Sequence, residues 1–308
     1  MFSWIVALAL YVIVGQSNPA MALADLNLMS RSFLPLASDT MTAEIAGPTK
    51  KDPTRLGIKT ESRAAVIVDW DSEQVLMRKN AEWPLPIASI TKLMTALVVL
   101  DSGLPLDTPV TIQSADIRTG GIPYVIPGEE ILAGDLLHAS LIASANTATM
   151  SLARATGLTD EEFVSRMNSL GQEIGLRETT FIEPTGLDAN NISPASDVAL
   201  LVKQALGSKT ISEIARLERY EFDALTGLRH VISSTDDLLG SSISKPPYTF
   251  MGGKTGYIIE AGYCFAAAAE NGQGNRVIAV VLGAPSKEVR FAEVSSLLYW
   301  AFDAFMWD

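Results

Sequence analysis

The segment Pro86-Ile87-Ala88-Ser89-Ile90-Thr91-Lys92-Leu93-Met94-Thr95-Ala96 contains a serine and a lysine three residues apart at the start of a long apolar run. Residues 89–100 are apolar on nearly every side, which predicts a helix buried at the centre of the molecule. On that helix Ser89 and Lys92 stand at positions i and i+3, on one face, with the hydroxyl near the helix N-terminus. A lysine whose pKa is lowered by burial can take the hydroxyl proton, and the free N–H groups of a helix start favour an oxyanion. The stretch therefore predicts a serine nucleophile with a lysine base.

The composition excludes several classes of protein. The 308 residues carry 23 basic and 35 acidic side chains, and the resulting net charge of −12 argues against a nucleic-acid-binding protein. A hydrophobic fraction of 48% supports a large packed core. The only cysteine, Cys264, forbids an internal disulfide, and together with His138 and His230 it cannot form a His/Cys zinc site. We expect an enzyme without metal or other cofactor, in which these three residues serve packing or the surface.

The N-terminal residues are expected to act as an export signal. Thirteen of the fourteen residues from Met1 to Val14 are apolar, a length typical of a signal peptide and shorter than the roughly 20 residues that span a bilayer. Ala22-Leu23-Ala24 offers a cleavage site before Asp25. No Lys or Arg precedes the apolar run, so residues 1–24 are predicted to be either a cleaved signal peptide or a membrane tether. The predicted location is the periplasm or the outer face of the cytoplasmic membrane.

The remaining sequence predicts one α+β domain behind a lead-in. Residues 25–61 have no sustained period and are expected to be poorly ordered. Residues 62–308 form the domain, with an α/β layer over about 62–110 and 225–308 and a helical subdomain over about 111–224. Alternating or apolar runs predict strands at 64–70, 74–78, 248–258, 261–270 and 276–283, and helical periods predict helices at 135–143, 147–155, 160–174, 196–206 and 287–305.

Two further short motifs follow the first. Ser144-Ala145-Asn146 lies between two predicted helices, and Lys254-Thr255-Gly256 lies in a predicted strand. A Ser-x-x-Lys match alone is weak evidence, since Ser242-Ile243-Ser244-Lys245 fits as well; there, however, two prolines follow and prevent the helix that would align the two groups. The three motifs in this order are typical of penicillin-binding proteins and serine β-lactamases.

With these motifs, the chain from about Ala64 to Phe305 resembles the low-molecular-mass penicillin-binding proteins, the serine D-alanyl-D-alanine carboxypeptidases and endopeptidases of the peptidase S11 kind. Phe181 to Leu187, Gly253 to Tyr257, and Ala261-Gly262-Tyr263 also look like that family's sequence. The resemblance implies a β-lactamase/transpeptidase-like fold, in which an antiparallel sheet is flanked by helices and carries an inserted all-α subdomain. It implies peptidoglycan stem peptides as substrates and β-lactam antibiotics as inhibitors.

The resemblance also implies a role for each site residue. Ser89 would be acylated, Lys92 would be its base, and Ser144 would relay the proton to the leaving amine. The implied substrate-binding residues are Asn146 for the substrate amide, Lys254 and Thr255 for the terminal carboxylate, Gly256 and Tyr257 in the binding strand, and Arg290 as an aid to carboxylate binding. The backbone N–H groups of Ser89 and Tyr257 would form the oxyanion hole.

Several alternatives stay open at the level of the sequence. The sequence around Glu183 favours an endopeptidase that cuts cross-links, and so does the end of the chain at Asp308, directly after the last helix. A class A β-lactamase has, between the second and third motifs, a glutamate that activates a deacylating water. Glu183 lies in that interval, although we expect it to be a structural turn residue. A non-catalytic wall-binding protein is the remaining alternative. Thr147 stands where the family often has an acidic residue, which leaves the contacts of that loop open.

Overall fold

The computed structural model describes residues 46–307. The predicted signal peptide or tether at 1–24, and the first part of the predicted lead-in, lie outside the described residues. Over residues 46–307 no helix is both long enough and apolar enough to cross a membrane.

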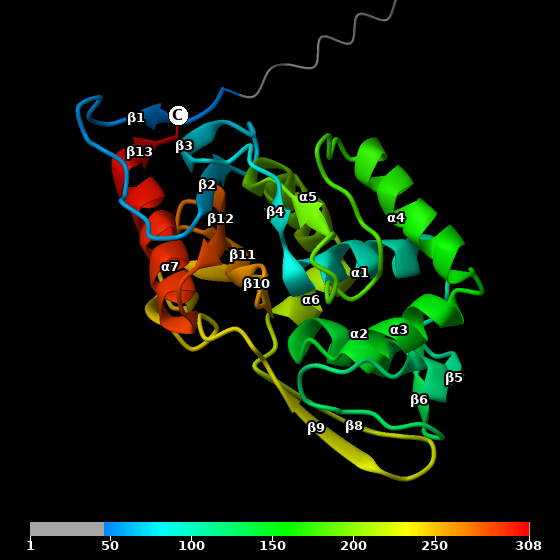
Figure 1. The fold of residues 1–308 in the computed structure, drawn as a ribbon. Helices are drawn as coiled ribbons and strands as arrows, with labels where there is room; N and C mark the ends of the chain where they lie inside the picture. The colour runs from blue at the N-terminus through cyan, green and yellow to red at the C-terminus, as the bar shows by residue number, and fades with distance from the viewer. Residues whose placement is uncertain (1–45, 308) are drawn as a thin grey trace, which may run out of the picture. The chain divides into compact units, whose positions relative to one another are not determined.

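A five-stranded antiparallel sheet forms one layer of the domain (Figure 1). Its order is β10-β11-β12-β2-β3, with β2 at Ala64–Asp69, β3 at Val75–Lys79, β10 at Thr249–Ile258, β11 at Gly262–Glu270 and β12 at Arg276–Ala284. Alternate residues of β2 enter separate cores, since Val66 packs on one face of the sheet and Ile67 on the other. Both faces are therefore covered, which explains why the central strands are apolar throughout.

One face of the sheet is covered by α7, Lys287–Ala304, which begins where Ser286 accepts a hydrogen bond from the N–H of Val289. The chain leaves α7 into β13, Phe305–Met306, which pairs antiparallel with β1, Thr49–Lys50. Within the described part of the expected lead-in, residues 46–61, Thr49–Lys50 is thus the one segment that forms a strand.

The other six helices of residues 46–307 lie on the opposite side of the sheet, where α5 packs against β2, β11 and β12 (Figure 1). These are α1 at Thr91–Asp101, α2 at Ala133–Ile142, α3 at Asn146–Ala155, α4 at Asp160–Glu173, α5 at Ala195–Gly207 and α6 at Lys209–Ala215. The predicted central helix is confirmed, since α1 is buried among α2, α3, α4 and α5. Ser89 itself lies in a 3-10 turn, Ala88–Ile90, because the positive φ of Ala88 (49°) delays the start of the α-helix.

Part of the region expected to be helical is instead a β-hairpin. Strands β8, Arg219–Asp223, and β9, Arg229–Ser233, pair antiparallel, and α6 precedes them. The other short pairs join β4, Leu85–Pro86, to β7, Ile192–Ser193, and β5, Pro109–Thr111, to β6, Glu130–Leu132. The predicted α+β architecture with an inserted helical block is otherwise confirmed.

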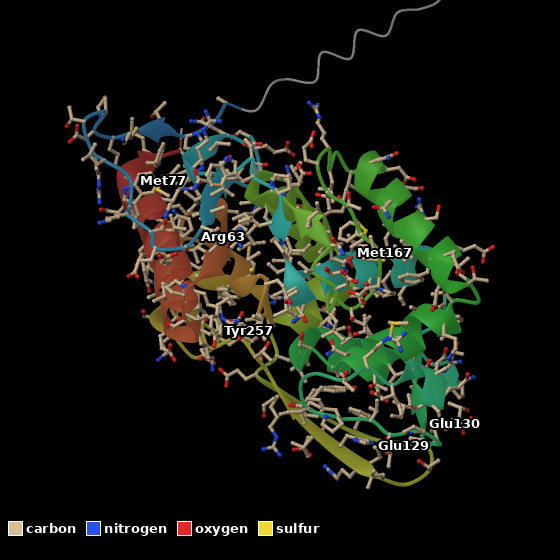
Figure 2. The ribbon with its side chains drawn as sticks, in the orientation of Figure 1. Arg63, Met77, Glu129, Glu130, Met167 and Tyr257 are labelled. Atoms are coloured by element: carbon tan, nitrogen blue, oxygen red, sulfur yellow. The ribbon has the colours of Figure 1, made fainter. Side chains whose placement is uncertain are left out.

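Both histidines serve packing around this hairpin. The ring of His138 stacks on Tyr220 with centroids 3.9 Å apart, and His230 stacks on Phe222 at 4.7 Å. Buried His230 also lies 3.0 Å from the carboxylate of Glu129 through Nε2. Figure 2 labels Glu129 and Glu130 beside the turn of the hairpin, where the N–H of Leu225 donates to the carbonyl oxygen of Glu130 at 2.7 Å.

Candidate active site

The predicted nucleophile and base face each other at the start of α1. The Nζ of Lys92 lies 3.0 Å from the Oγ of Ser89, and it also lies 2.7 Å from Oδ1 of Asn146 and 2.6 Å from the carbonyl oxygen of Thr185. Lys92 is fully buried, and burial lowers the pKa of its amine from 10.5 to about 7, while the Glu183 carboxylate opposes the shift. A neutral amine keeps two N–H donors for Asn146 and Thr185, and its lone pair then faces the hydroxyl of Ser89.

Two glycines allow the backbone to close around Ser89. A Cβ on Gly186, whose φ is +81°, would lie 1.9 Å from the carbonyl oxygen of Ala88 and 2.9 Å from the nitrogen of Ser89. A Cβ on Gly256 would lie 3.2 Å from the same nitrogen. Only residues without a side chain fit at these positions, so the 181–191 loop and β10 both press on the backbone that carries the nucleophile.

The 181–191 loop is held by Glu183 and Asn191. The Glu183 carboxylate accepts hydrogen bonds from the N–H and hydroxyl of Thr185, at 2.7 and 2.6 Å, and from the N–H of Gly186. Fully buried Asn191 donates to Glu183 Oε1 at 2.9 Å and accepts from the N–H of Ile182 at 2.7 Å. Glu183 is therefore the structural turn residue that the sequence predicted, and its carboxylate does not line the cavity beside Ser89.

A second lysine lies behind the hydroxyl of Ser144. Lys254 is 1% exposed, and its Nζ donates to Ser144 Oγ at 3.0 Å. Ser144 has a φ of +58°, so the turn between α2 and α3 places it in an unusual backbone conformation. Burial lowers the pKa of Lys254 well below its ordinary value, and Lys92 and Arg290 lower it further. Beside it, the hydroxyls of Thr255 and Thr235 are 2.6 Å apart.

Arg290 and Asp236 complete the buried charges of the site. Arg290 of α7 is 5% exposed and donates from Nη1 to the carbonyl oxygen of Gly256 at 3.1 Å. Asp236 is 7% exposed, and its Oδ1 accepts from the N–H of Leu238 at 2.9 Å while its buried Oδ2 has no partner among the described residues. Burial raises the pKa of Asp236 to about 7, and the positive charges of Lys254 and Arg290 oppose that rise.

Asn146 connects the base to the far wall of the site. Its Oδ1 accepts a hydrogen bond from Lys92, and its Nδ2 donates to the carbonyl oxygen of Gly120 at 2.8 Å. The next residue, Thr147, accepts from the N–H of Arg118 at 3.3 Å through its hydroxyl. The loop that carries Gly120 is thus attached to the start of α3 at two points, by an amide and by a hydroxyl.

These groups surround a cavity of about 590 Å³. Of the nine residues that the sequence predicted, seven line it directly, and Lys92 and Lys254 lie just behind it; the lining seven are Ser89, Ser144, Asn146, Thr255, Gly256, Tyr257 and Arg290. Figure 2 labels Tyr257, whose ring lies against that of Tyr263 with centroids 4.4 Å apart. The second Ser-x-x-Lys match plays no part in this site, since Ser242 lies in a separate 3-10 turn and its hydroxyl accepts from Tyr299 at 2.7 Å.

Several residues of the site carry no signal in the sequence. Gly120, Gly121, Ile122 and Tyr124 line the cavity although they belong to a loop without a recognisable motif. Thr235 and Asp236 follow β9 in a short polar run that reads only as a turn. The sequence shows a threonine and an aspartate between β9 and Leu238-Leu239, which by themselves do not indicate a role in the site. The tertiary fold brings the pair close to Lys254.

The comparisons with known proteins agree with this geometry. A family model described as D-alanyl-D-alanine carboxypeptidase matches residues 49–286. The chain is 33% identical to the D-alanyl-D-alanine carboxypeptidase DacF of Bacillus subtilis, over 80% of this chain and 63% of the relative's length. It is 32% identical to a D-alanyl-D-alanine endopeptidase of Pseudomonas aeruginosa, over 89% of this chain and 87% of that protein. The Streptomyces K15 DD-transpeptidase structure superposes with a TM-score of 0.74 at 26% identity, covering 81% of this chain and all of that one.

Proposed function

The chain belongs to the D-alanyl-D-alanine carboxypeptidase family of serine peptidases, peptidase S11, and we propose that it removes the terminal D-alanine of peptidoglycan stem peptides. The observation that carries the proposal is the pairing of Ser89 with a buried lysine whose pKa is about 7, beside a second buried lysine at Ser144. A hydrolase needs a base that is neutral at working pH and an electrostatic site for an anionic substrate. Both are present within one cavity.

The first half-reaction forms an acyl-enzyme. Lys92 accepts the proton of the Ser89 hydroxyl as Oγ attacks the carbonyl carbon of the penultimate D-alanine. The backbone N–H groups of Ser89 and Tyr257 stabilise the resulting oxyanion. When the C–N bond breaks, the proton reaches the leaving amine through Ser144, whose hydroxyl is held by Lys254. The products are an ester on Ser89 and free D-alanine.

The second half-reaction consumes water. Lys92, again neutral after it has released the proton, activates a water molecule that attacks the ester, and Ser89 regains its proton as the shortened peptide leaves. A β-lactam presents the same carboxylate next to a strained amide, so it acylates Ser89 by the same route. Because the leaving amine of a β-lactam stays attached, a long-lived adduct is expected.

Substrate recognition begins with the terminal carboxylate. Lys254 and Arg290 supply positive charge, and the hydroxyls of Thr255 and Thr235 supply hydrogen bonds at the mouth of the site. Asn146 binds the substrate amide, with the amide nitrogen that now holds Gly120 as its donor. The enzyme is proposed to work after export, at the periplasm or the outer face of the cytoplasmic membrane.

Cleavage of cross-links is the second candidate function. It is favoured by the endopeptidase of Pseudomonas aeruginosa, which matches at nearly the same identity as the carboxypeptidase of Bacillus subtilis and over more of its length. A class A β-lactamase reaction is disfavoured because the carboxylate of Glu183 is occupied by its own loop. A purely wall-binding role would not require the base to face the nucleophile at 3.0 Å.

Labelling with a fluorescent penicillin tests the proposal. We expect a lasting adduct on Ser89, located by peptide mapping, which is absent in Ser89→Ala. A pentapeptide ending in D-Ala-D-Ala and a cross-linked dimer, assayed side by side, then separate carboxypeptidase from endopeptidase action. Rapid turnover of penicillin would instead indicate a β-lactamase, and absence of any adduct would overturn the proposed function.

A further inference from the structure

One wall of the active-site cavity is the outer edge of the sheet. Strand β10 is the outermost strand on its side, and its end, with the turn that follows, lines the cavity from Thr255 to Glu260. An edge strand presents backbone N–H and C=O groups that an extended peptide can pair with. The edge of β10 therefore offers backbone hydrogen-bonding groups to the part of the substrate that precedes the reacting bond.

The groups already described set the direction of the peptide along that edge. In the proposed reaction the terminal carboxylate would lie at Thr255 and Arg290, in front of buried Lys254. The reacting carbonyl would lie beside Ser89, where Gly256 approaches the backbone of the nucleophile. A strand advances by about 3.3 Å per residue. For an extended peptide that runs antiparallel to β10, the penultimate residue would lie beside Tyr257. The third residue from the C-terminus would lie one step further, at Ile258 and the start of the turn formed by Ile259 and Glu260.

The chemistry at this end of the cavity is distinctive. Ile259 is 85% exposed in the turn between β10 and β11, and Ile122, which lines the same cavity, is 65% exposed. Glu260 follows Ile259 and is also exposed, and it is the only acidic residue that lines the cavity. Two aliphatic side chains suit the methylene chain of a substrate residue, and a carboxylate beyond them suits a positive charge at its end.

The surroundings of Glu260 leave its carboxylate available. Arg63 donates to the backbone carbonyl oxygen of Glu260 at 3.5 Å. Within residues 46–307 the carboxylate of Glu260 takes part in no ion pair. Figure 2 labels Arg63, which directly precedes β2, and Tyr257, which lies in β10.

We propose that Ile122, Ile259 and Glu260 form a subsite for the side chain of the third residue from the substrate's C-terminus, and that it selects a free ammonium group on that side chain. The ligand class is a stem peptide whose diamino acid is not acylated on its side-chain nitrogen. This inference rests on the proposed function, because it takes the direction of the substrate from the carboxylate site. It adds a specificity that the reacting groups themselves do not provide.

Two tripeptides that differ only in that charge test the subsite. Nα-acetyl-L-lysyl-D-alanyl-D-alanine keeps the side-chain ammonium, and its Nα,Nε-diacetyl counterpart lacks it. We expect the full-length protein to hydrolyse the first with a kcat/KM about fivefold higher at low salt, as for an exposed ion pair, and the ratio to fall towards one at 1 M salt. Glu260→Gln is expected to remove the preference, and Glu260→Lys to reverse it. Glu161→Gln, an exposed change on α4, serves as the matched control and keeps the preference.

Labelling with fluorescent penicillin separates the two levels of failure. If neither penicillin nor peptide reacts at Ser89, the proposed function fails. The subsite is overturned if Ser89 is labelled but the wild-type protein does not distinguish the two peptides. That outcome means equal kcat/KM for both peptides and an equal slowing of penicillin labelling when either peptide is present as a competitor. It is equally overturned if Glu260→Gln keeps the wild-type preference while still being labelled. The salt dependence of the wild-type ratio checks the inference without any variant.

Discussion

The carbonyl oxygen of Thr185 lies 2.6 Å from the Nζ of Lys92, although the two residues are 93 positions apart in the chain. Together with Asn146 it provides two fixed acceptors for the amine, so the third direction of Nζ is left for Ser89. The 181–191 loop therefore helps to orient the Lys92 amine towards Ser89. Its own rigidity comes from the Glu183 carboxylate.

Glu183→Gln tests this structural role. The amide loses half of the acceptor capacity that now binds Thr185, Gly186 and Asn191, so we expect a loss of about 1–3 kcal/mol in the free energy of unfolding. Acylation by penicillin should slow because Lys92 is aimed less well, while the lifetime of the adduct should stay close to that of wild type. Urea unfolding and the labelling time course measure both. A much longer-lived adduct at an unchanged acylation rate would show instead that Glu183 activates the hydrolytic water.

The pH dependence of acylation reports on Lys92. Its amine must be neutral to accept the Ser89 proton, and its pKa is lowered to about 7 by burial. The second-order rate of penicillin acylation is therefore expected to rise with pH, with a midpoint near 7. Lys92→Arg, which stays charged, should lose at least about 10²-fold in rate at pH 8. A rate that is flat from pH 5.5 to 8.5 would exclude Lys92 as the base.

Local patterns in the sequence were sufficient to predict the sheet, the buried helix α1 and the residues that gather around Ser89. These predictions rested on residues close together in the chain, such as Ser89 and Lys92, or on motifs whose spacing the fold preserves. Their catalytic roles remain predictions. Hairpin β8–β9 was missed because Arg219–Asp223 is short and highly charged, and so resembles a loop.

Other features had no local signal at all. The pairing of Thr49–Lys50 with Phe305–Met306 joins the two ends of the described chain, and neither strand is long enough to show a period. Asp236 became part of the site only because the turn after β9 packs against β10, where Thr235 meets Thr255. Such contacts depend on tertiary structure, so composition and periodicity do not reveal them.

Asp236→Asn is expected to change how the carboxylate site responds to pH. The negative charge of Asp236 raises the pKa of Lys254, against the lowering by burial and by the other cations. Without that charge Lys254 loses its proton at lower pH, so the alkaline limb of kcat/KM for peptides ending in a carboxylate should move to lower pH. The fall in kcat/KM at alkaline pH should come mainly from a rise in KM. Asp237→Asn is the matched control, because exposed Asp237 pairs with Lys287 at 2.8 Å. Superimposable pH profiles for Asp236→Asn and wild type would refute this role.

The same substitution should stabilise the fold at alkaline pH. The folded state raises the pKa of Asp236 from 3.8 to about 7, so it favours the protonated form. The stabilising contribution is present below pH 3.8 and is lost as the pH rises through about 7. Asn stays neutral, and we expect Asp236→Asn to gain about 1–3 kcal/mol over wild type at pH 8 and little at pH 4. Urea unfolding at the two pH values measures the difference, and an equal gain at both would contradict the argument.

Gly186→Ala tests the contact that positions the nucleophile. At a φ of +81° an alanine is strained, and its Cβ would lie 1.9 Å from the carbonyl oxygen of Ala88, so the loop or the turn at Ser89 must move. We expect a loss of about 3 kcal/mol or more in stability, together with a large fall in the penicillin acylation rate. Gly207→Ala is the control, since Gly207 ends α5 with open space around it and alanine should be neutral or gain up to about 1 kcal/mol. If Gly186→Ala unfolds and labels like wild type, the close approach of this loop to Ser89 does not hold the nucleophile in place.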